Sequence, residues 1–213
     1  MEAFRKVTGA AAPLLLDDVN TDQIIPSAYL KDMKADLGQG LLAYMRRTPE
    51  GITRADFVLE KPQFQGAPIL VVGRNFGCGS SREHAVWALR AFGIRCVIGP
   101  GPAEFFRENC LRNGVLPVVL DDAAMAEFSA CVVQADGRDP FTVDLETCRI
   151  TGPRGFASTF DLPASERTAL LEGLDDIGLT LRHADEIVAW EARTAGLRPF
   201  MQASIRDLVA GAD

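Results

Sequence analysis

The sequence predicts an α/β fold that has a parallel βαβαβ core and a short antiparallel ribbon. Between residues 69 and 120, short apolar runs alternate with longer segments in which apolar residues recur at helical spacing. Parallel strands need crossover connections, and helices usually supply them, so this alternation indicates a parallel sheet. After Pro140 the pattern changes to short runs of alternating apolar and polar residues, which are typical of antiparallel strands.

Glycines mark the ends of the core elements. A glycine-rich turn over residues 73–79 follows the first apolar run. Gly93 and Gly114 stand where the next two helices should end, because glycine readily takes the left-handed conformation of a helix C-terminus. We expect strands over residues 69–72, 95–98 and 116–120, and helices over residues 82–92, 102–113 and 123–134.

The flanking segments are less regular. Residues 14–47 mix turn-forming residues with short helical pieces, and the glycines at 38 and 40 indicate a mobile loop near residues 31–40. Without an internal repeat or a low-complexity segment, we expect a single domain over residues 1–213. Beyond Pro140 we expect ribbon strands over 141–145, 147–150 and 156–160, helices over 163–174 and 184–194, and a strand over 177–181.

Composition and charge exclude several classes of partner. With 47% hydrophobic residues, a chain of 213 residues can bury a substantial core. The net charge of -7 disfavours nucleic acid and anionic membrane surfaces as partners, so an anionic ligand needs a local cationic device. No apolar stretch approaches the roughly 18 to 20 residues of a membrane span, and we expect a cytoplasmic protein.

The five cysteines are scattered along the chain without a Cys-x-x-Cys pair. Metal and iron–sulfur sites usually draw their ligands from such closely spaced pairs. We therefore expect reduced thiols and no metal held by this chain itself. The two histidines, His84 and His183, are too far apart in the sequence to change that expectation.

The segment that follows the first core strand combines glycines, serines and a cation. Ser80 and Glu83 have the Ser-x-x-Glu spacing of a capping box, which predicts a helix N-cap at Ser80 or Ser81. The backbone N–H groups of a helix N-terminus attract carboxylates, and Gly79, like Gly77, allows a ligand to approach the backbone. Arg82 adds a planar donor fork suited to a carboxylate. A purely structural cap fits this spacing about equally well.

Other motifs fit this segment poorly. No lysine precedes Ser80, as a phosphate-binding loop requires, and Arg82 stands where a dinucleotide fingerprint needs its last glycine. A Gly-x-Ser-x-Gly nucleophile elbow is absent. Cys78 and His84 leave open a thiol hydrolase, although nothing in the sequence enforces their contact.

The string from Asn75 to Ala85, Asn-Phe-Gly-Cys-Gly-Ser-Ser-Arg-Glu-His-Ala, closely resembles the signature of the swivelling domain of the aconitase superfamily. Within that superfamily it is most similar to the small subunits of bacterial 3-isopropylmalate dehydratase. Residues 20–26 resemble the first active-site segment of that family, and residues 173–183 with 187–192 resemble its C-terminal signature. The resemblance therefore spans nearly the whole chain.

The resemblance implies a swivelling β/β/α fold and a hydro-lyase that moves a hydroxyl group between adjacent carbons by dehydration and rehydration. By position in the motif, Ser80 would be the base, with Asp22 in the supporting catalytic network. Ser81, Arg82 and Gly79 would bind a small dicarboxylic hydroxy acid. The resemblance also implies a [4Fe-4S] cluster carried by a separate aconitase-like large subunit, in a heterodimer or heterotetramer.

The chain departs from the family pattern where a substrate arginine is usual. That arginine corresponds to Ala35, which leaves Lys34 as the only nearby cation and the candidate substrate ligand. Asp18 and Asn20 exchange the side chains that the family usually has. These differences keep open a paralogous dehydratase for citraconate, maleate or a methylmalate. An RNA-binding regulatory module is a further alternative, which the acidic composition disfavours.

Overall fold

The computed structural model describes residues 1–31 and 36–196. These fall into two compact units, Met1–Leu174 and the described part of Asp175–Asp213. The two units are described separately, so the expectation of one domain over the whole chain stays a prediction. Lys34 and Ala35 lie outside the described residues.

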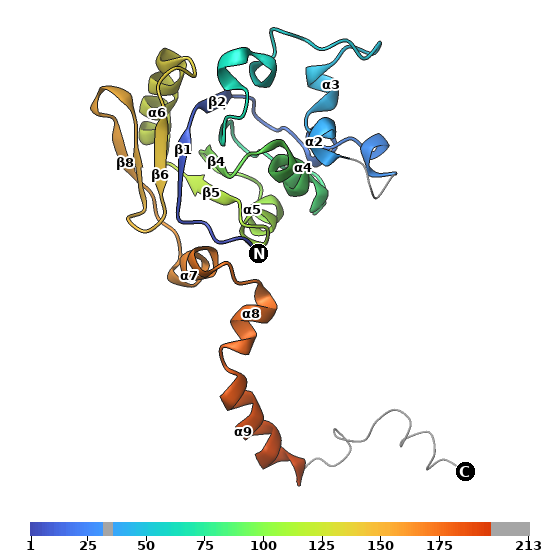
Figure 1. The fold of residues 1–213 in the computed structure, drawn as a ribbon, viewed down its shortest axis with the longest axis vertical. Coiled ribbons are helices and arrows are strands. Elements are labelled where there is room, and N and C mark those ends of the chain that lie inside the picture. The colour runs from blue at the N-terminus through green and yellow to red at the C-terminus, as the bar shows by residue number, and fades with distance from the viewer. Residues whose placement is uncertain (32–35, 197–213) are drawn as a thin grey trace. The chain divides into compact units, whose positions relative to one another are not determined.

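A four-stranded parallel sheet forms the centre of the first unit (Figure 1). Its strands are β2 (Ala11–Leu14), β3 (Ile69–Val72), β4 (Cys96–Gly99) and β5 (Leu116–Val119), which pair in that order. Every residue of β3 and β4 is buried, as expected of parallel strands covered on both faces. The predicted parallel core is confirmed, with β2 as an additional strand at one edge.

Helices cover both faces of this sheet. Leu70 and Val72 of β3 pack with α4 (His84–Phe92) and α5 (Glu104–Arg112) in one core cluster. Ile69 and Val71, the alternating residues, pack on the other face with α6 (Asp122–Ala135). Since successive side chains of a strand point to opposite faces, one short strand contributes to both cores.

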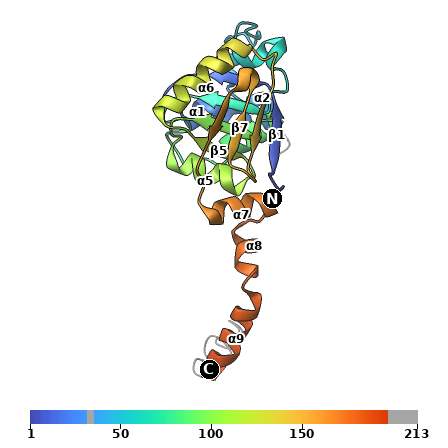
Figure 2. The same cartoon turned by 90° about the vertical axis from the view of Figure 1, so that its left-hand side faces the viewer.

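A second, antiparallel sheet packs against the same core cluster as α6 (Figure 2). Its strands pair in the order β1 (Lys6–Gly9), β6 (Phe141–Asp144), β7 (Arg149–Thr151) and β8 (Ala157–Thr159). Phe141 and Val143 are buried, whereas Thr142 and Asp144, which alternate with them, are partly exposed, as expected of a sheet with one buried face. The predicted ribbon is confirmed, and β1 joins it from the N-terminus.

The described part of the segment between β2 and β3 contains short helices joined by turns and irregular chain. They are the α-helices α1 (Thr21–Ile24), α2 (Leu37–Gly40) and α3 (Ala43–Arg46), and the 3₁₀ helices η1 (Ser27–Leu30), η2 (Val58–Glu60) and η3 (Pro62–Phe64). Within the predicted mobile loop, residues 37–40 form α2, whose two glycines are buried. The mobility of the loop stays a prediction. A Cβ at Gly40 would overlap the side chains of Ile25 and Tyr29, so the glycine serves close packing rather than flexibility.

Four further elements complete the described chain. The 3₁₀ helix η4 (Pro153–Gly155) joins β7 to β8, and α7 (Ala164–Glu172) ends the first unit. The second unit contains α8 (Asp176–Leu181) and α9 (Ala184–Ala195). The predicted strand over 177–181 is wrong, because the Asp175 carboxylate caps a helix there by accepting from the Gly178 N–H at 2.7 Å. Within the described residues, no helix is long and apolar enough to cross a membrane.

Candidate active site

The candidate site lies where α1 meets the glycine-rich turn after β3. Asn20 caps α1: its side chain accepts from the Gln23 N–H at 2.9 Å, and the Gln23 side chain accepts from the Asn20 N–H at 2.8 Å. This reciprocal capping box satisfies two backbone donors that a helix start otherwise leaves unpaired. It fixes the direction in which Thr21 and Asp22 enter the helix.

Backbone hydrogen bonds join α1 to the turn. The Thr21 N–H donates to the Cys78 carbonyl at 2.8 Å, and the Gly77 N–H donates to the Val19 carbonyl at 2.7 Å. Asn20 and Cys78 consequently form an isolated parallel bridge. The two segments are far apart in the sequence, yet they act as one short extension of the parallel sheet.

Ser80 is exposed, and its hydroxyl lies 2.9 Å from the hydroxyl of Thr21. The Ser80 backbone N–H also donates to the Thr21 oxygen, at 3.3 Å. Thr21 itself is 1% exposed. A buried hydroxyl on α1 therefore holds an accessible hydroxyl of the turn.

Arg82 forms an ion pair with Asp22, the residue after Thr21. The same nitrogen, Nη1, donates to the Ile25 carbonyl at 3.4 Å. In the part of the chain that the structure describes, Nη2 and Nε of Arg82 make no hydrogen bond. The Arg82 side chain is only 25% exposed, against 67% for Asp22, so the guanidinium lies partly shielded from water behind its carboxylate.

The predicted N-cap at Ser80 or Ser81 is wrong. Helix α4 begins at His84 with Glu83 in the cap position, and no side chain caps it. Both serines have other roles: the Ser80 hydroxyl contacts Thr21, and the Ser81 carbonyl accepts from the Asn109 side chain at 3.1 Å. Ser80 precedes the helix, whereas the Arg82 carbonyl accepts from the Ala85 N–H at 3.3 Å just before α4 begins. The predicted helix start at residue 82 is therefore two residues early.

The two glycines of the turn differ in function. Gly79 is exposed and has a φ of 98°. A Cβ added there would lie 3.4 Å from the Thr21 hydroxyl oxygen, which is an ordinary van der Waals distance. Gly77 has a φ of 81°, but a Cβ there would lie within 2.5 Å of Cβ and Cδ2 of Phe106. The expected approach of a ligand is thus compatible with Gly79 and wrong for Gly77, which faces the core.

Cys78 and His84 have separate environments. The Cys78 thiol donates to the Asp18 carbonyl at 3.5 Å, whereas the His84 ring lies 4.5 Å from the Trp87 ring. This geometry gives no support to a thiol–imidazole pair. Burial raises the pKa of the Cys96 and Cys110 thiols, which makes both poor nucleophiles and poor metal ligands.

Sequence reasoning missed three residues that hold the site together: Thr21, Asn109 and Asn113. The Asn109 side chain, 7% exposed, reaches from α5 to the Ser81 carbonyl. The Asn113 amide donates to the Glu83 carboxylate at 2.7 Å and steadies the start of α4. A polar residue among the apolar positions of α5 was the only available signal, since the contacts themselves depend on the fold.

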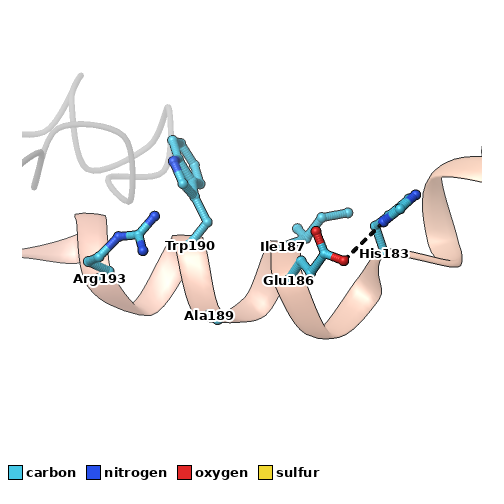
Figure 3. Close-up of a pocket in the computed structure, with 6 residues that line it drawn as sticks. All are labelled: His183, Glu186, Ile187, Ala189, Trp190 and Arg193. Carbon is cyan, nitrogen blue, oxygen red and sulfur yellow. Dashed lines mark hydrogen bonds and ion pairs between the residues drawn. The ribbon is translucent and has the colours of Figure 1, made fainter.

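Two hollows in the described surface have none of these residues in their linings. One, at the end of β2, is lined by residues such as Leu15, Arg54 and Phe57. The other runs along α9 in the second unit, where His183 approaches the Glu186 carboxylate at 3.2 Å beside Trp190 (Figure 3). Within residues 1–31 and 36–196, no group of three or more His, Cys, Asp or Glu is arranged to hold a metal ion.

Comparison with known proteins relates the chain to one family throughout its length. Residues 1–123 match the model of the aconitase C-terminal domain, and residues 176–203 match that of the C-terminal domain of the 3-isopropylmalate dehydratase small subunit. The 3-isopropylmalate dehydratase small subunit of Allorhizobium ampelinum is 48% identical over 201 residues, covering 94% of this chain and 100% of that protein. Its counterpart from Dinoroseobacter shibae is 46% identical over 202 residues, with the same coverage of both chains.

A solved structure agrees with these sequence matches. The crystal structure of 3-isopropylmalate dehydratase from Methanocaldococcus jannaschii is 25% identical and superposes with a TM-score of 0.59, covering 86% of this chain and 99% of that one. The family that the glycine-rich turn indicated is therefore confirmed by matches over most of the chain. The chain belongs to the family of 3-isopropylmalate dehydratase small subunits, within the aconitase C-terminal domain family.

Proposed function

We propose that this chain is the small subunit of a hydro-lyase that isomerises 2-isopropylmalate and 3-isopropylmalate by dehydration and rehydration, a step of leucine biosynthesis. The relatives that it matches carry the name of that enzyme. The observation that carries the proposal is local: two consecutive residues of α1, Thr21 and Asp22, hold an exposed serine and a partly shielded arginine.

Ser80 is the residue that we assign as the base. A serine hydroxyl has a very high pKa, so it accepts a carbon-bound proton only where donors and a cation stabilise its anionic form. Since Ser80 does not cap α4, we propose that this stabilisation comes from hydrogen-bond donors beside the hydroxyl and from Arg82. The exposure of Ser80 lets a substrate reach the hydroxyl.

Arg82 is the residue that we assign to a substrate carboxylate. The ion pair with Asp22 occupies Nη1 and orients the guanidinium plane. The edge formed by Nη2 and Nε can then bind both oxygens of a carboxylate, which is the geometry that arginine favours. Exposed Ser81 and Gly79 border the same segment and would contact the substrate beside it. Lys34 remains a candidate ligand that lies outside the described residues.

The loss of hydroxide needs a Lewis acid, and the cysteines of this chain do not fit one. Cys96 and Cys110 are buried, and in the described chain no cluster of potential ligands is present. A [4Fe-4S] cluster carried by an aconitase-like large subunit would supply that chemistry when bound. We therefore propose a heterodimer or heterotetramer whose active site is completed at the exposed edge around Ser80.

Two further parts of the proposal concern substrate and location. The position of the family arginine is Ala35 here, which keeps a related dicarboxylate such as citraconate, maleate or a methylmalate as the alternative substrate. All five cysteines are free thiols, which fits the reducing cytoplasm that we propose as the location.

The test is to coexpress the chain with an aconitase-like large subunit and to replace Ser80 by alanine. We expect Ser80→Ala to lower the dehydration rate of 3-isopropylmalate by about 10²- to 10⁴-fold, since that is the usual contribution of a general base. Copurification of the two subunits should remain unchanged, because the exposed hydroxyl contributes little to packing. Initial rates would be measured for isopropylmalate, citraconate, maleate and citramalate in parallel.

Ser165 provides the matched control, because it is an exposed serine on α7. Ser165→Ala should retain the wild-type rate. If Ser80→Ala also kept that rate, Ser80 would not be the base. A wild-type complex that dehydrated citraconate-type substrates but not isopropylmalate would favour the alternative substrate, and turnover by the isolated chain would contradict the two-subunit site.

A further inference from the structure

Thr21 is a buried threonine whose described side-chain hydrogen bonds all go to Ser80. Its oxygen accepts from the Ser80 N–H at 3.3 Å and lies 2.9 Å from the Ser80 hydroxyl. At 1% exposure, Thr21 has no access to bulk water. Packing alone does not explain a threonine at position 21, because a valine of the same shape would fill the space without a hydroxyl.

The direction of the hydroxyl hydrogen bond follows from the need to satisfy buried groups. A threonine hydroxyl has one hydrogen to donate and two lone pairs to accept with. One lone pair receives the Ser80 N–H, and among the described residues the only acceptor within reach of the Thr21 hydrogen is the Ser80 oxygen. Buried donors are almost always paired, so Thr21 donates to Ser80. The Ser80 hydrogen is thereby left to point away from α1.

Thr21 is itself held on three sides. Its N–H donates to the Cys78 carbonyl at 2.8 Å, and its carbonyl accepts from the Ile25 N–H at 2.9 Å. The capping box of Asn20 and Gln23 fixes the first turn of α1 around it. Because the threonine backbone cannot shift easily, its hydroxyl presents a hydrogen at a defined position next to Ser80.

We propose that Thr21 is a positioning residue for the reaction: it fixes the side-chain rotamer of Ser80 and donates a hydrogen bond that stabilises the Ser80 oxygen in its anionic form. This inference rests on the proposed function, in which Ser80 is the base. Thr21 acts through Ser80 and does not touch the substrate. A hydrogen bond to a charged group is stronger than one to a neutral group, so the stabilisation grows as the proton leaves the serine.

Charged and titratable groups near the contact between Thr21 and Ser80 could also change the pH dependence of the reaction. On the two segments that meet there, residues 17–25 and 73–84, these groups are Asp17, Asp18, Asp22, Arg74, Cys78, Arg82, Glu83 and His84. Helix α5 faces the same segment with the neutral amide of Asn109. A substitution at Thr21 changes none of these charges, so an altered pH profile of the variant would report on Ser80.

The experiment compares three variants of the two-subunit complex: Thr21→Val, which keeps the shape and removes the hydroxyl, Thr21→Ser, which restores the hydroxyl, and Thr142→Val. Thr142 is a matched control because its hydroxyl also lies 2.9 Å from another hydroxyl, that of Thr8, on the antiparallel sheet. Measurements are kcat and KM for isopropylmalate, the pH dependence of kcat, and the crystal structure of each small subunit.

The expected result is selective. Thr21→Val should lower kcat by about 10- to 100-fold, the usual effect of one hydrogen bond to a charged group, with KM changed by less than about threefold. The pH at which kcat reaches half its maximum should rise, and the Ser80 side chain should occupy another rotamer. Thr21→Ser should recover kcat to within about threefold of wild type, and Thr142→Val should match wild type.

Three outcomes would overturn the inference. They are an unchanged kcat in Thr21→Val, a loss in Thr21→Ser equal to that in Thr21→Val, and a loss of activity without any change of the pH profile. If Thr21→Val fails to fold, Thr21→Ala removes the same hydroxyl without risk of overpacking. A wild-type complex without dehydratase activity would instead refute the proposed function, whereas an active wild type with an indifferent Thr21→Val refutes only the role of Thr21.

Discussion

Gly77 and Gly79 stand two residues apart in the turn, both with left-handed backbone, yet the fold requires them for different reasons. At Gly79 the constraint is conformational, because a Cβ would find ordinary van der Waals distances. At Gly77 the same conformation coincides with direct overlap of a Cβ with the Phe106 ring. Phe106 in turn packs edge-on against Phe76, with ring centroids 5.4 Å apart. The turn is therefore anchored in the core at Gly77 and open to ligands at Gly79.

We predict that Gly77→Ala destabilises the first unit more than Gly79→Ala. Both variants carry the strain of a left-handed alanine, about 1 kcal/mol, and Gly77→Ala adds overpacking of roughly 1 to 3 kcal/mol. Urea unfolding monitored by circular dichroism would measure both. Equal free energies of unfolding would show that the core tolerates a methyl group against Phe106.

The exchange of Asp and Asn at positions 18 and 20, relative to the family pattern, has a physical explanation. Asn20 caps α1 through its side-chain oxygen, which an aspartate would supply equally well. The Asp18 carboxylate accepts from the Asn75 amide at 2.8 Å, and an asparagine oxygen could do the same. Each position needs only an oxygen acceptor, so the exchange preserves the site.

At the scale of elements, Arg46 explains why α2 is ordered. Its guanidinium donates to the Gly38 and Leu41 carbonyls at 3.2 and 3.0 Å and pairs with the Glu60 carboxylate at 2.5 Å. The side chain is 9% exposed and lies over the Phe92 ring of α4. One buried cation thus links α2, α4 and η2.

We predict that Arg46→Met destabilises the protein by roughly 3 kcal/mol, because it leaves the Glu60 carboxylate and two buried carbonyls without their donor. Hydrogen exchange of the amides of residues 37–41 should accelerate. Arg138→Met serves as the control, since Arg138 forms a 3.6 Å ion pair on a side chain that is 80% exposed. An effect no larger than that of the control would mean that α2 is held by apolar packing alone.

The elements differ in how far the sequence could predict them. Strand β3 was found because its apolar run ends at a glycine-rich turn, and helices α4 and α5 were found because Gly93 and Gly114 mark their ends. Helix α6 was found although it ends at Asp136, in the left-handed conformation, and not at a glycine. Strand β2 was missed because Pro13 lacks an N–H and is unusual in a sheet; it is tolerated because β2 is an edge strand. The stretch 177–181 looked like a strand by composition, but the Asp175 cap starts a helix there.

The site was predictable by residue type and not by geometry. Ser80, Arg82 and Asp22 were identified from the motif, and the structure brings the latter two together. The capping box was assigned to Ser80 and Glu83, whereas the Asn20–Gln23 pair forms one. Both pairs have the required spacing, and only tertiary contacts decide: Asn113 binds the Glu83 carboxylate, and Thr21 binds the Ser80 hydroxyl.

At the scale of the whole molecule, the buried residues are concentrated in the first unit. Both core clusters draw their members from residues between Phe4 and Leu170. In α8 and α9 no described residue is buried, and large side chains such as Ile177 and Val188 are 70% and 62% exposed. Within its described part, residues 175–196, the second unit therefore adds no buried residue to either core cluster.

We predict that a chain ending at Leu174 keeps the fold of the first unit. Its melting temperature should stay within about 4 °C of that of the full chain, which corresponds to less than about 1 kcal/mol in a protein of this size. Near-ultraviolet circular dichroism and thermal unfolding would test it. A molten spectrum, with helical signal but no fixed aromatic environment, would show that residues 175–213 contribute to the first core.

The bridge between Asn20 and Cys78 bears on the stage of folding at which the candidate site forms. Thr21 is 59 residues from Ser80 in the sequence and Asp22 is 60 residues from Arg82, so each pair meets only after two distant stretches of chain have been brought side by side. Closing such a long loop is entropically costly and belongs to the later stages of folding. In a nascent or partly folded chain, Ser80 consequently lacks the hydrogen bond from Thr21. Recovery of activity during refolding therefore reports the formation of native tertiary contacts and not the amount of helix.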